Sequence, residues 1–168
     1  MKHFQFLFVL LSGCVNRWHT LPTVKAEDNA QHQWLTCVVC EYIYPDCSKN
    51  LLKHCLLHDS AEAAIGDLPS PVRLDFPDLS KQFKQAEKEL LSAIGIDEDH
   101  LDIQERKIFK LCDLLANYLF LKAEDSFGNK TTFDAMQRSR HNADIYIEEN
   151  EFDESTNEKS YKILGLKR

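Results

Sequence analysis

The sequence predicts an all-α protein with a single compact domain. Apolar residues recur at helical spacing along nearly the whole chain, and no stretch shows the alternation of a strand. Glycine and proline number only five each in 168 residues, so long coil segments are not expected. A chain of this length can bury one proper core. We predict one domain over residues 1–150, followed by an acidic, polar and loosely held tail over residues 151–168.

The first predicted helix covers residues 3–13 and ends at a glycine. Lys2 and the apolar run that follows also resemble a secretory signal, and residues 11–14 (LSGC) resemble a bacterial lipoprotein cleavage site. The run is too short to cross a bilayer. Arg17-Trp18, which belongs to the candidate site described below, follows only three residues after the supposed cleavage point. We therefore expect a buried first helix, an uncleaved chain and a cytoplasmic protein.

The second predicted helix follows an extended loop over residues 19–27, which holds a proline and β-branched residues. It starts at Asp28 or Asn29, both good N-caps, and continues up to Pro45. Residues 58–67 predict a short helical turn ended by a glycine, and three prolines predict a loop over residues 68–77. The remaining predicted helices each show one apolar face: residues 48–57, 78–94, 103–124 and 132–149.

The formal net charge is −7, and acidic residues concentrate near the C-terminus. A net-negative chain is a poor general binder of DNA or RNA, because affinity for these polymers comes largely from neutralising phosphates. We expect no nucleic-acid polymer and no membrane as a partner. A small anionic substrate can still bind where a few cations are focused in one cleft.

The six cysteines predict free, buried thiols rather than disulfides, because most fall on apolar helical stripes and the chain does not need cross-links. Cys37 and Cys40 form a CxxC pattern, but it lies in the middle of a helix, whereas a redox site needs an exposed helix N-terminus. A structural zinc site formed with Cys47 and Cys55 stays open as an alternative.

Four residues carry the predicted chemistry. His58 and Asp59 are adjacent at a helix end, where a neutral nitrogen and a hard oxygen can face one metal. His32 lies near the start of the second predicted helix among polar residues. Asp113 lies inside the apolar run IFKLCDLLANYLF, where an ionised carboxylate needs a strong partner such as a metal or an arginine. Each has an ordinary structural explanation alone, but the pattern H…HD…D on successive helices is more specific.

This pattern resembles the HD superfamily of metal-dependent phosphohydrolases, and within it the small deoxynucleotidase-like branch, over about residues 10–122. The resemblance implies a compact HD-domain helical bundle. Its further motifs are Arg17-Trp18, the segment Asn29 to Gln33, the block His58-Asp59-Ser60-Ala61-Glu62, the run from Gly66 to Arg73, and Lys110 to Asp113. One departure is Gln31-His32-Gln33, where the family more often has Glu-His-Ser. A carboxylate beside the first metal histidine is therefore expected to be missing.

The resemblance implies a divalent metal ion, Zn, Co, Mn or Mg, with room for more than one ion in the site. The implied ligands of the first ion are His32, His58, Asp59 and Asp113. Glu62 lies one helical turn from the His-Asp pair and is implied to activate water or to help hold a second ion. Asp67 is the second candidate for both roles.

A deoxynucleotide is the implied substrate. Arg17, Arg73 and Lys110 are the candidate phosphate-binding cations, although each alone can be a solvated surface charge. Trp18 is the candidate sugar-reading residue, because a rigid aromatic beside the ribose leaves no room for a 2'-hydroxyl. A core tryptophan is the alternative. The candidate base contacts are His19, Thr20 and Pro71.

The reaction stays open between two enzymes. The short spacing between the metal motifs resembles that of small phage-encoded members, some of which hydrolyse dATP to deoxyadenosine and triphosphate. Three candidate cations are also more than a single phosphate needs. We favour this dATP triphosphohydrolase. The alternatives are a 5'-deoxynucleotidase acting on deoxynucleoside monophosphates and a catalytically inactive HD module that binds nucleotides. We also expect a homo-oligomer and, for a phage-encoded protein, a place in the host cytoplasm.

Overall fold

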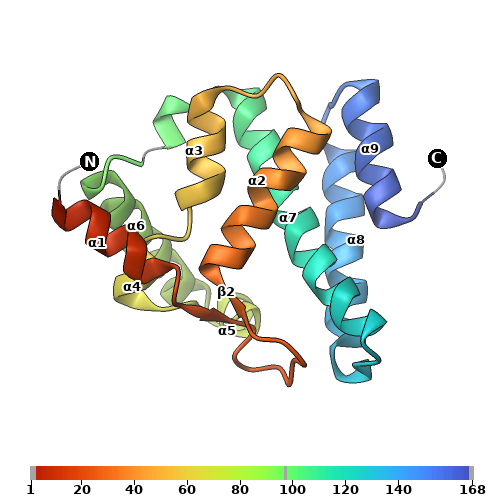
Figure 1. Ribbon diagram of the computed structural model, residues 1–168, viewed down its shortest axis with the longest axis horizontal. Helices are drawn as coiled ribbons and strands as arrows, with labels where there is room; N and C mark the ends of the chain where they lie inside the picture. Colours follow the sequence, from red (N-terminus) through yellow and green to blue (C-terminus); the bar gives the residue numbers. More distant parts are fainter. Residues whose placement is uncertain (1–2, 97, 167–168) are drawn as a thin grey trace.

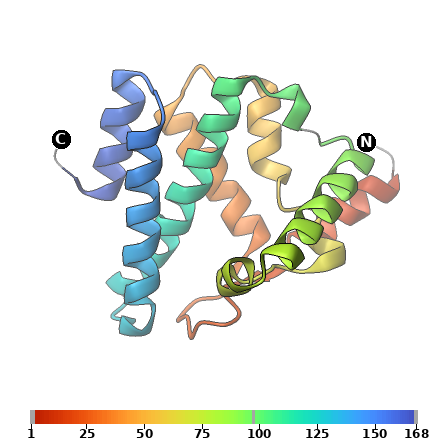
Figure 2. The same cartoon turned by 180° about the vertical axis from the view of Figure 1, so that it is seen from behind.

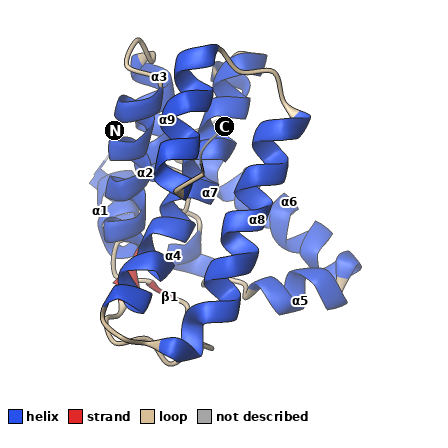
Figure 3. Ribbon diagram, turned by 90° about the vertical axis from the view of Figure 1, so that its right-hand side faces the viewer, coloured by secondary structure: helices blue, strands red, loops and turns tan. Residues whose placement is uncertain are grey.

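The computed structural model describes residues 3–96 and 98–166, and this part of the chain is helical nearly throughout (Figures 1 and 3). The all-α prediction is confirmed. The described helices are α1 (His3–Ser12), α2 (Asn29–Ile43), α3 (Lys49–Leu57), α4 (Glu62–Ile65), α5 (Ser70–Asp75), α6 (Pro77–Ala93), α7 (Ile103–Ser126), α8 (Phe133–Glu149) and α9 (Glu154–Leu164), with 3-10 turns at Glu98–His100 and Lys130–Thr132. None of these helices combines the length and the apolar character that a membrane crossing requires.

Helix α7 forms the centre of the bundle and packs against α2, α3, α8 and α9 (Figure 1). It begins with a capping box, in which Asp102 accepts the backbone N–H of Glu105 and the Glu105 side chain accepts that of Asp102. Its apolar positions supply the middle of the core. The fully buried core residues are Cys40, Leu51, Cys55, Ile108, Leu111, Cys112, Leu115, Ala116, Leu121 and Ala143.

All six cysteines are free, and three of them are buried in this core. Among the residues that the structure describes, no group of cysteines lies close enough to hold a metal ion. The prediction of buried thiols is confirmed for these three, whereas Cys14 is exposed.

A two-stranded antiparallel sheet, β1 (Asn16–Arg17) and β2 (Glu27–Asp28), closes the loop before α2. Asp28 caps α2 by accepting the N–H of Gln31, as predicted. The loop between the strands is held to α7 by Glu124, whose carboxylate accepts the backbone N–H groups of residues 24 and 25. The strand pairing places Arg17 opposite Glu27, shortly before α2 begins.

Two expectations about the N-terminal half of the chain are wrong. The first helix is present but not buried: Ser12 is its one buried residue among those described, and Phe4 is 73% exposed. Residues 68–77 are not a loop, because Ser70–Asp75 form α5 and Pro77 begins α6. Both helices have a proline in the first turn. A backbone N–H at that position has no acceptor within the helix, so a proline there costs no helical hydrogen bond. Helices α5 and α6 form an arm beside the bundle (Figures 2 and 3).

The described part of the predicted tail, residues 151–166, is not loosely held. Within it, α9 begins at an Asp153 cap and packs against α2, α7 and α8. Its inward positions are Thr156, Ser160 and Leu164. Two of these are small and polar, and each hydroxyl donates to a backbone carbonyl, so burial leaves neither without a partner.

A substitution in α9 tests this correction. Leu164 is 1% exposed, so Leu164→Ala should lower the free energy of unfolding by about 2–4 kcal/mol through lost burial and an unfilled cavity. Lys162→Ala, at an exposed position of the same helix, is the matched control and should change it by less than about 0.5 kcal/mol. Denaturant unfolding measures both. Equal stability of the two variants would mean that α9 does not belong to the core.

Candidate metal centre

Two histidines and an aspartate from separate segments meet at one point beside α7. His32 lies in the first turn of α2 and is fully buried, and His58 caps the C-terminus of α3. The Oδ2 atom of Asp59 lies 3.3 Å from His58 Nε2 and 3.7 Å from His32 Nε2. One ligand atom from each residue lies within 4.8 Å of the other two. The structure therefore brings together three of the four predicted metal ligands.

Asp113 lies at the edge of this cluster. Its Oδ1 atom is 3.3 Å from His32 Nε2, whereas Oδ2 accepts a hydrogen bond from Lys110 at 2.7 Å. Asn117, one turn further along α7, donates to Oδ1 at 3.0 Å. The Asp113 carboxylate thus faces His32 of the cluster and also accepts hydrogen bonds from Lys110 and Asn117 of its own helix.

The residues present fit a divalent cation. Both ring nitrogens of His32 and the Nε2 atom of His58 are buried, and none of them has a hydrogen-bond partner among the described residues. Buried nitrogens without partners are costly, and a metal would supply the missing partner for the two that face Asp59. Burial, with Arg17 nearby, lowers the pKa of His32 to about 4, so its ring is neutral and able to ligate. His32 Nδ1 also lacks a carboxylate partner, as the departure at Gln31 suggests.

Arg17 supplies the fixed positive charge of the site. Its Nη1 atom donates to Asp59 Oδ2 at 2.6 Å, and Nη2 donates to Asn117 at 3.1 Å. Burial opposes the guanidinium charge, but Asp59 and Glu27 raise the pKa of Arg17 above its ordinary value. Burial likewise opposes ionisation of Asp59, yet His58 and Arg17 hold the pKa of that carboxyl below its usual range. Asp59 is therefore an anion, and the guanidinium of Arg17 balances its charge.

Glu62 lies in the first turn of α4, close to Asp59, and is 2% exposed. Asn29 donates to Glu62 Oε2 at 2.8 Å and holds the carboxylate in place. Burial, together with the charge of Asp59, raises the pKa of Glu62 to about 8. A carboxyl group with a pKa this close to neutral pH can take up and release a proton there, as a general acid or base must.

Trp18 stands between the core and the cavity. Its indole stacks on Phe120 with ring centres 6.1 Å apart, and its Nε1 atom donates to the fully buried Glu27 at 2.6 Å. The residue has a φ of 55°, the left-handed region that a bulky side chain rarely adopts. These contacts fix the ring, and the outer part of Trp18 lines the cavity.

A cavity of about 370 Å³ opens beside the cluster. Of the residues predicted to contact metal or substrate, those that line it are Arg17, Trp18, Thr20, Asp59, Glu62, Asp67, Pro71, Arg73, Lys110 and Asp113. His19 is 44% exposed, and its Nδ1 atom lies 3.6 Å from the Asp67 carboxylate. The arrangement can hold a cation and a phosphate beside a carboxylate that accepts protons.

Sequence reasoning missed the contribution of three side chains that support the site: Glu27, Asn117 and Asn29. Glu27 pairs with Arg17 across the small sheet, and its carboxylate lies 3.4 Å from the Arg17 Nε atom. Burial raises its pKa to about 7. The one available signal was the spacing of Asn117, four residues after Asp113, which places both on the same face of a helix.

Comparisons with known proteins agree with this geometry. A family model described as an HD domain matches residues 14–160. Proteins named 5'-deoxynucleotidase from Yersinia pestis and Yersinia pseudotuberculosis are 26% identical over 161 residues, covering 82% of this chain and 81% of each relative.

Two solved structures share the fold. One is the cyanophage S-2L HD phosphohydrolase (DatZ) bound to dA and one catalytic Zn²⁺ ion, with a TM-score of 0.79 and 18% identity over 98% of this chain and 95% of that one. The other is a conserved hypothetical protein from Pyrococcus furiosus, with a TM-score of 0.75 and 17% identity over 98% of this chain and 100% of that one.

Proposed function

Because the chain belongs to the HD domain family, we propose that it is a metal-dependent phosphohydrolase acting on a deoxyribonucleotide. The observation that carries the proposal is the cluster of His32, His58 and Asp59, with its unpartnered ring nitrogens, at the edge of a cavity lined by cations. The names of the similar proteins, 5'-deoxynucleotidase and HD phosphohydrolase, support the same class of substrate and reaction.

His32, His58, Asp59 and Asp113 would hold one divalent ion. When bound, such an ion lowers the pKa of a coordinated water and stabilises negative charge on phosphate oxygens. Zn, Co, Mn and Mg are the candidate ions, and Glu62 and Asp67, which both line the cavity, are the candidates for holding a second.

The residues of the chain have separate tasks in the reaction. Arg17, Arg73 and Lys110 bind phosphate oxygens and balance the charge that grows on them as water attacks phosphorus. Glu62, held by Asn29, takes the proton from the attacking water, and Asp67 is the alternative base. Trp18 packs against the sugar and excludes a 2'-hydroxyl.

Within this class, we favour a dATP triphosphohydrolase. Water would attack the phosphorus nearest the sugar, the bond from that phosphorus to the 5' oxygen would break, and the 5' oxygen would receive a proton, releasing deoxyadenosine and triphosphate. The number of cations around the cavity supports a substrate with several phosphates, and the dA bound to the cyanophage protein supports a deoxyadenosine nucleotide. The alternative is a 5'-deoxynucleotidase, which the names of the curated relatives support.

A screen of all deoxy- and ribonucleotide mono- and triphosphates with Mg, Mn, Co and Zn tests the proposal. The released species separate the candidates, because triphosphate comes from a triphosphohydrolase and orthophosphate from a nucleotidase. We expect metal-dependent release of triphosphate from dATP. Orthophosphate release confined to monophosphates would select the nucleotidase, and no release with any metal would contradict the class.

The sugar preference provides a further prediction. Trp18→Ala should change the deoxy-to-ribo ratio of kcat/KM by roughly tenfold to a hundredfold, because the variant no longer leaves a buried 2'-hydroxyl unpaired. Trp18→Phe, which keeps a ring over Phe120 but loses the N–H to Glu27, should retain most of the preference. The measurement compares dATP with ATP, and dAMP with AMP. An unchanged ratio in Trp18→Ala would make Trp18 a packing residue.

A further inference from the structure

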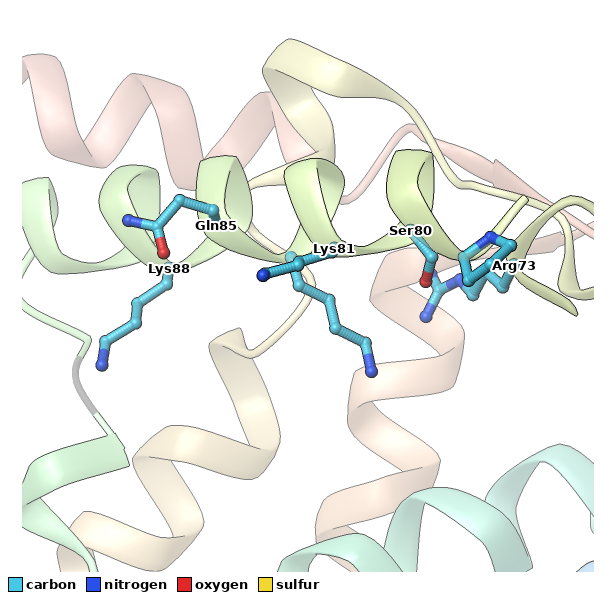
Figure 4. A pocket seen from close by; sticks show the side chains of 7 residues that line it. Arg73, Ser80, Lys81, Gln85 and Lys88 are labelled. Atoms are coloured by element: carbon cyan, nitrogen blue, oxygen red, sulfur yellow. The ribbon is translucent and has the colours of Figure 1, made fainter.

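A row of lysines lies outside the metal centre on one face of α6. Lys81, Lys84 and Lys88 recur at the spacing of three and four residues that places side chains together on a helix. They line an open groove of about 460 Å³, here called the lysine groove, and Figure 4 shows Arg73 near one end and Lys88 near the other. The other lining residues are Pro77, Ser80 and Gln85.

Positive charge in the lysine groove is only partly balanced by nearby acids. The lining residues include four cations and no acid, in a chain whose net charge is −7. Lys81, Lys84 and Lys88 are exposed, and in the described part of the chain none of them forms a salt bridge. The nearest acid to Arg73 is Glu87, at 4.0 Å, which is a weak pair. Local positive charge of this kind attracts and holds anions.

The lysine groove continues from the candidate catalytic cavity. Arg73 lines both of them, and its Nε atom donates to the Leu68 carbonyl at 2.9 Å, which fixes the side chain at the junction. Lys110 lies on the cavity side of the junction. An anion with several phosphates can therefore place one phosphate in the cavity and the others along α6.

We propose that the lysine groove binds the terminal phosphates of a deoxynucleoside triphosphate whose first phosphate lies in the cavity. This inference rests on the proposed function. Lys81 and Lys84 are about 4.5 Å apart along the helix axis, so their ammonium groups can reach neighbouring phosphates of a short linear chain. Lysine ammonium groups are flexible point charges that hold phosphates without demanding one geometry. A monophosphate cannot reach them, so the groove favours triphosphates.

The double substitution Lys81→Gln/Lys84→Gln tests this inference. Both side chains are exposed and lie outside the proposed catalytic machinery, so the variant should fold normally. We expect kcat/KM for dATP to fall about tenfold and kcat/KM for dAMP to change by less than about twofold. The Kd for inorganic tripolyphosphate, measured by calorimetry, should rise about tenfold in the same variant.

Lys49→Gln/Lys162→Gln is the matched control, because it removes the same charge from exposed positions on α3 and α9. It should leave all three quantities unchanged. Equal losses for dATP and dAMP, or equal losses in the control, would overturn the inference, since the lysines would then act only through net charge. Reduced binding of a short single-stranded oligodeoxynucleotide, with unchanged binding of tripolyphosphate, would also overturn it and assign the groove to a polymer.

The calorimetric measurement of tripolyphosphate binding tests the lysine groove separately from the proposed function. If the wild-type protein hydrolyses no nucleotide with any metal, the proposed function fails. The loss of tripolyphosphate affinity in Lys81→Gln/Lys84→Gln then still supports the lysine groove as a phosphate site, and the absence of that loss overturns the groove as well.

Discussion

Asp59→Asn should abolish metal binding and lower turnover of the deoxynucleotide at least about a thousandfold. Asp59 Oδ2 is the oxygen that faces both histidine nitrogens, and an amide cannot supply the negative charge that a divalent ion needs. The change also removes the carboxylate that pairs with the buried Arg17, so some loss of stability is expected.

Metal content by mass spectrometry, helical content by circular dichroism and turnover are measured on the same sample. Asp125→Asn is the control. It neutralises a carboxylate at the end of α7 that pairs with Lys130 and lies outside the cluster. A folded Asp59→Asn protein with full metal content and full turnover would remove Asp59 from the site.

Glu62→Gln should keep the first metal and lower turnover by about 10²–10⁴. Glutamine has nearly the same shape and can still accept the hydrogen bond from Asn29, but it cannot take a proton from water. The expected loss is therefore in kcat, with little change in KM. Single-turnover kinetics and metal analysis check both parts.

Asp67→Asn is the comparison for the same role, because Asp67 also lines the cavity. Near-normal turnover in Glu62→Gln, together with a large loss in Asp67→Asn, would transfer the role of the base to Asp67. Equal small losses in both variants would mean that neither carboxylate accepts the proton.

The centre of the candidate site could be predicted because its residues are unusual where they stand. An aspartate inside the apolar run of α7, and a His-Asp pair at a helix end, have few structural explanations. Glu27 gave no such signal. It lies in a polar stretch of the sequence. Only the pairing of β1 with β2 buries its carboxylate in contact with Trp18 and Arg17.

The errors in the fold have a common cause, since composition says how polar a segment is but not what covers it. The tail was expected to be loose because it is polar, yet α9 buries Thr156 and Ser160 by pairing their hydroxyls with backbone carbonyls. Helix α1 was expected to be buried because it is apolar, yet most of its large side chains are exposed. Such outcomes depend on tertiary packing that local patterns do not encode.

Turnover of dATP by metal-free protein, followed as divalent metal is added back, tests the central claim most directly. The protein is stripped with a chelator, dialysed, and titrated with Zn, Co, Mn or Mg while released phosphate species are identified. We predict no turnover in the stripped protein and recovery that saturates with bound metal, with His32, His58 and Asp59 required for both. Full turnover in the presence of chelator, or a folded protein that binds metal and nucleotide but never hydrolyses, would contradict a metal-dependent phosphohydrolase.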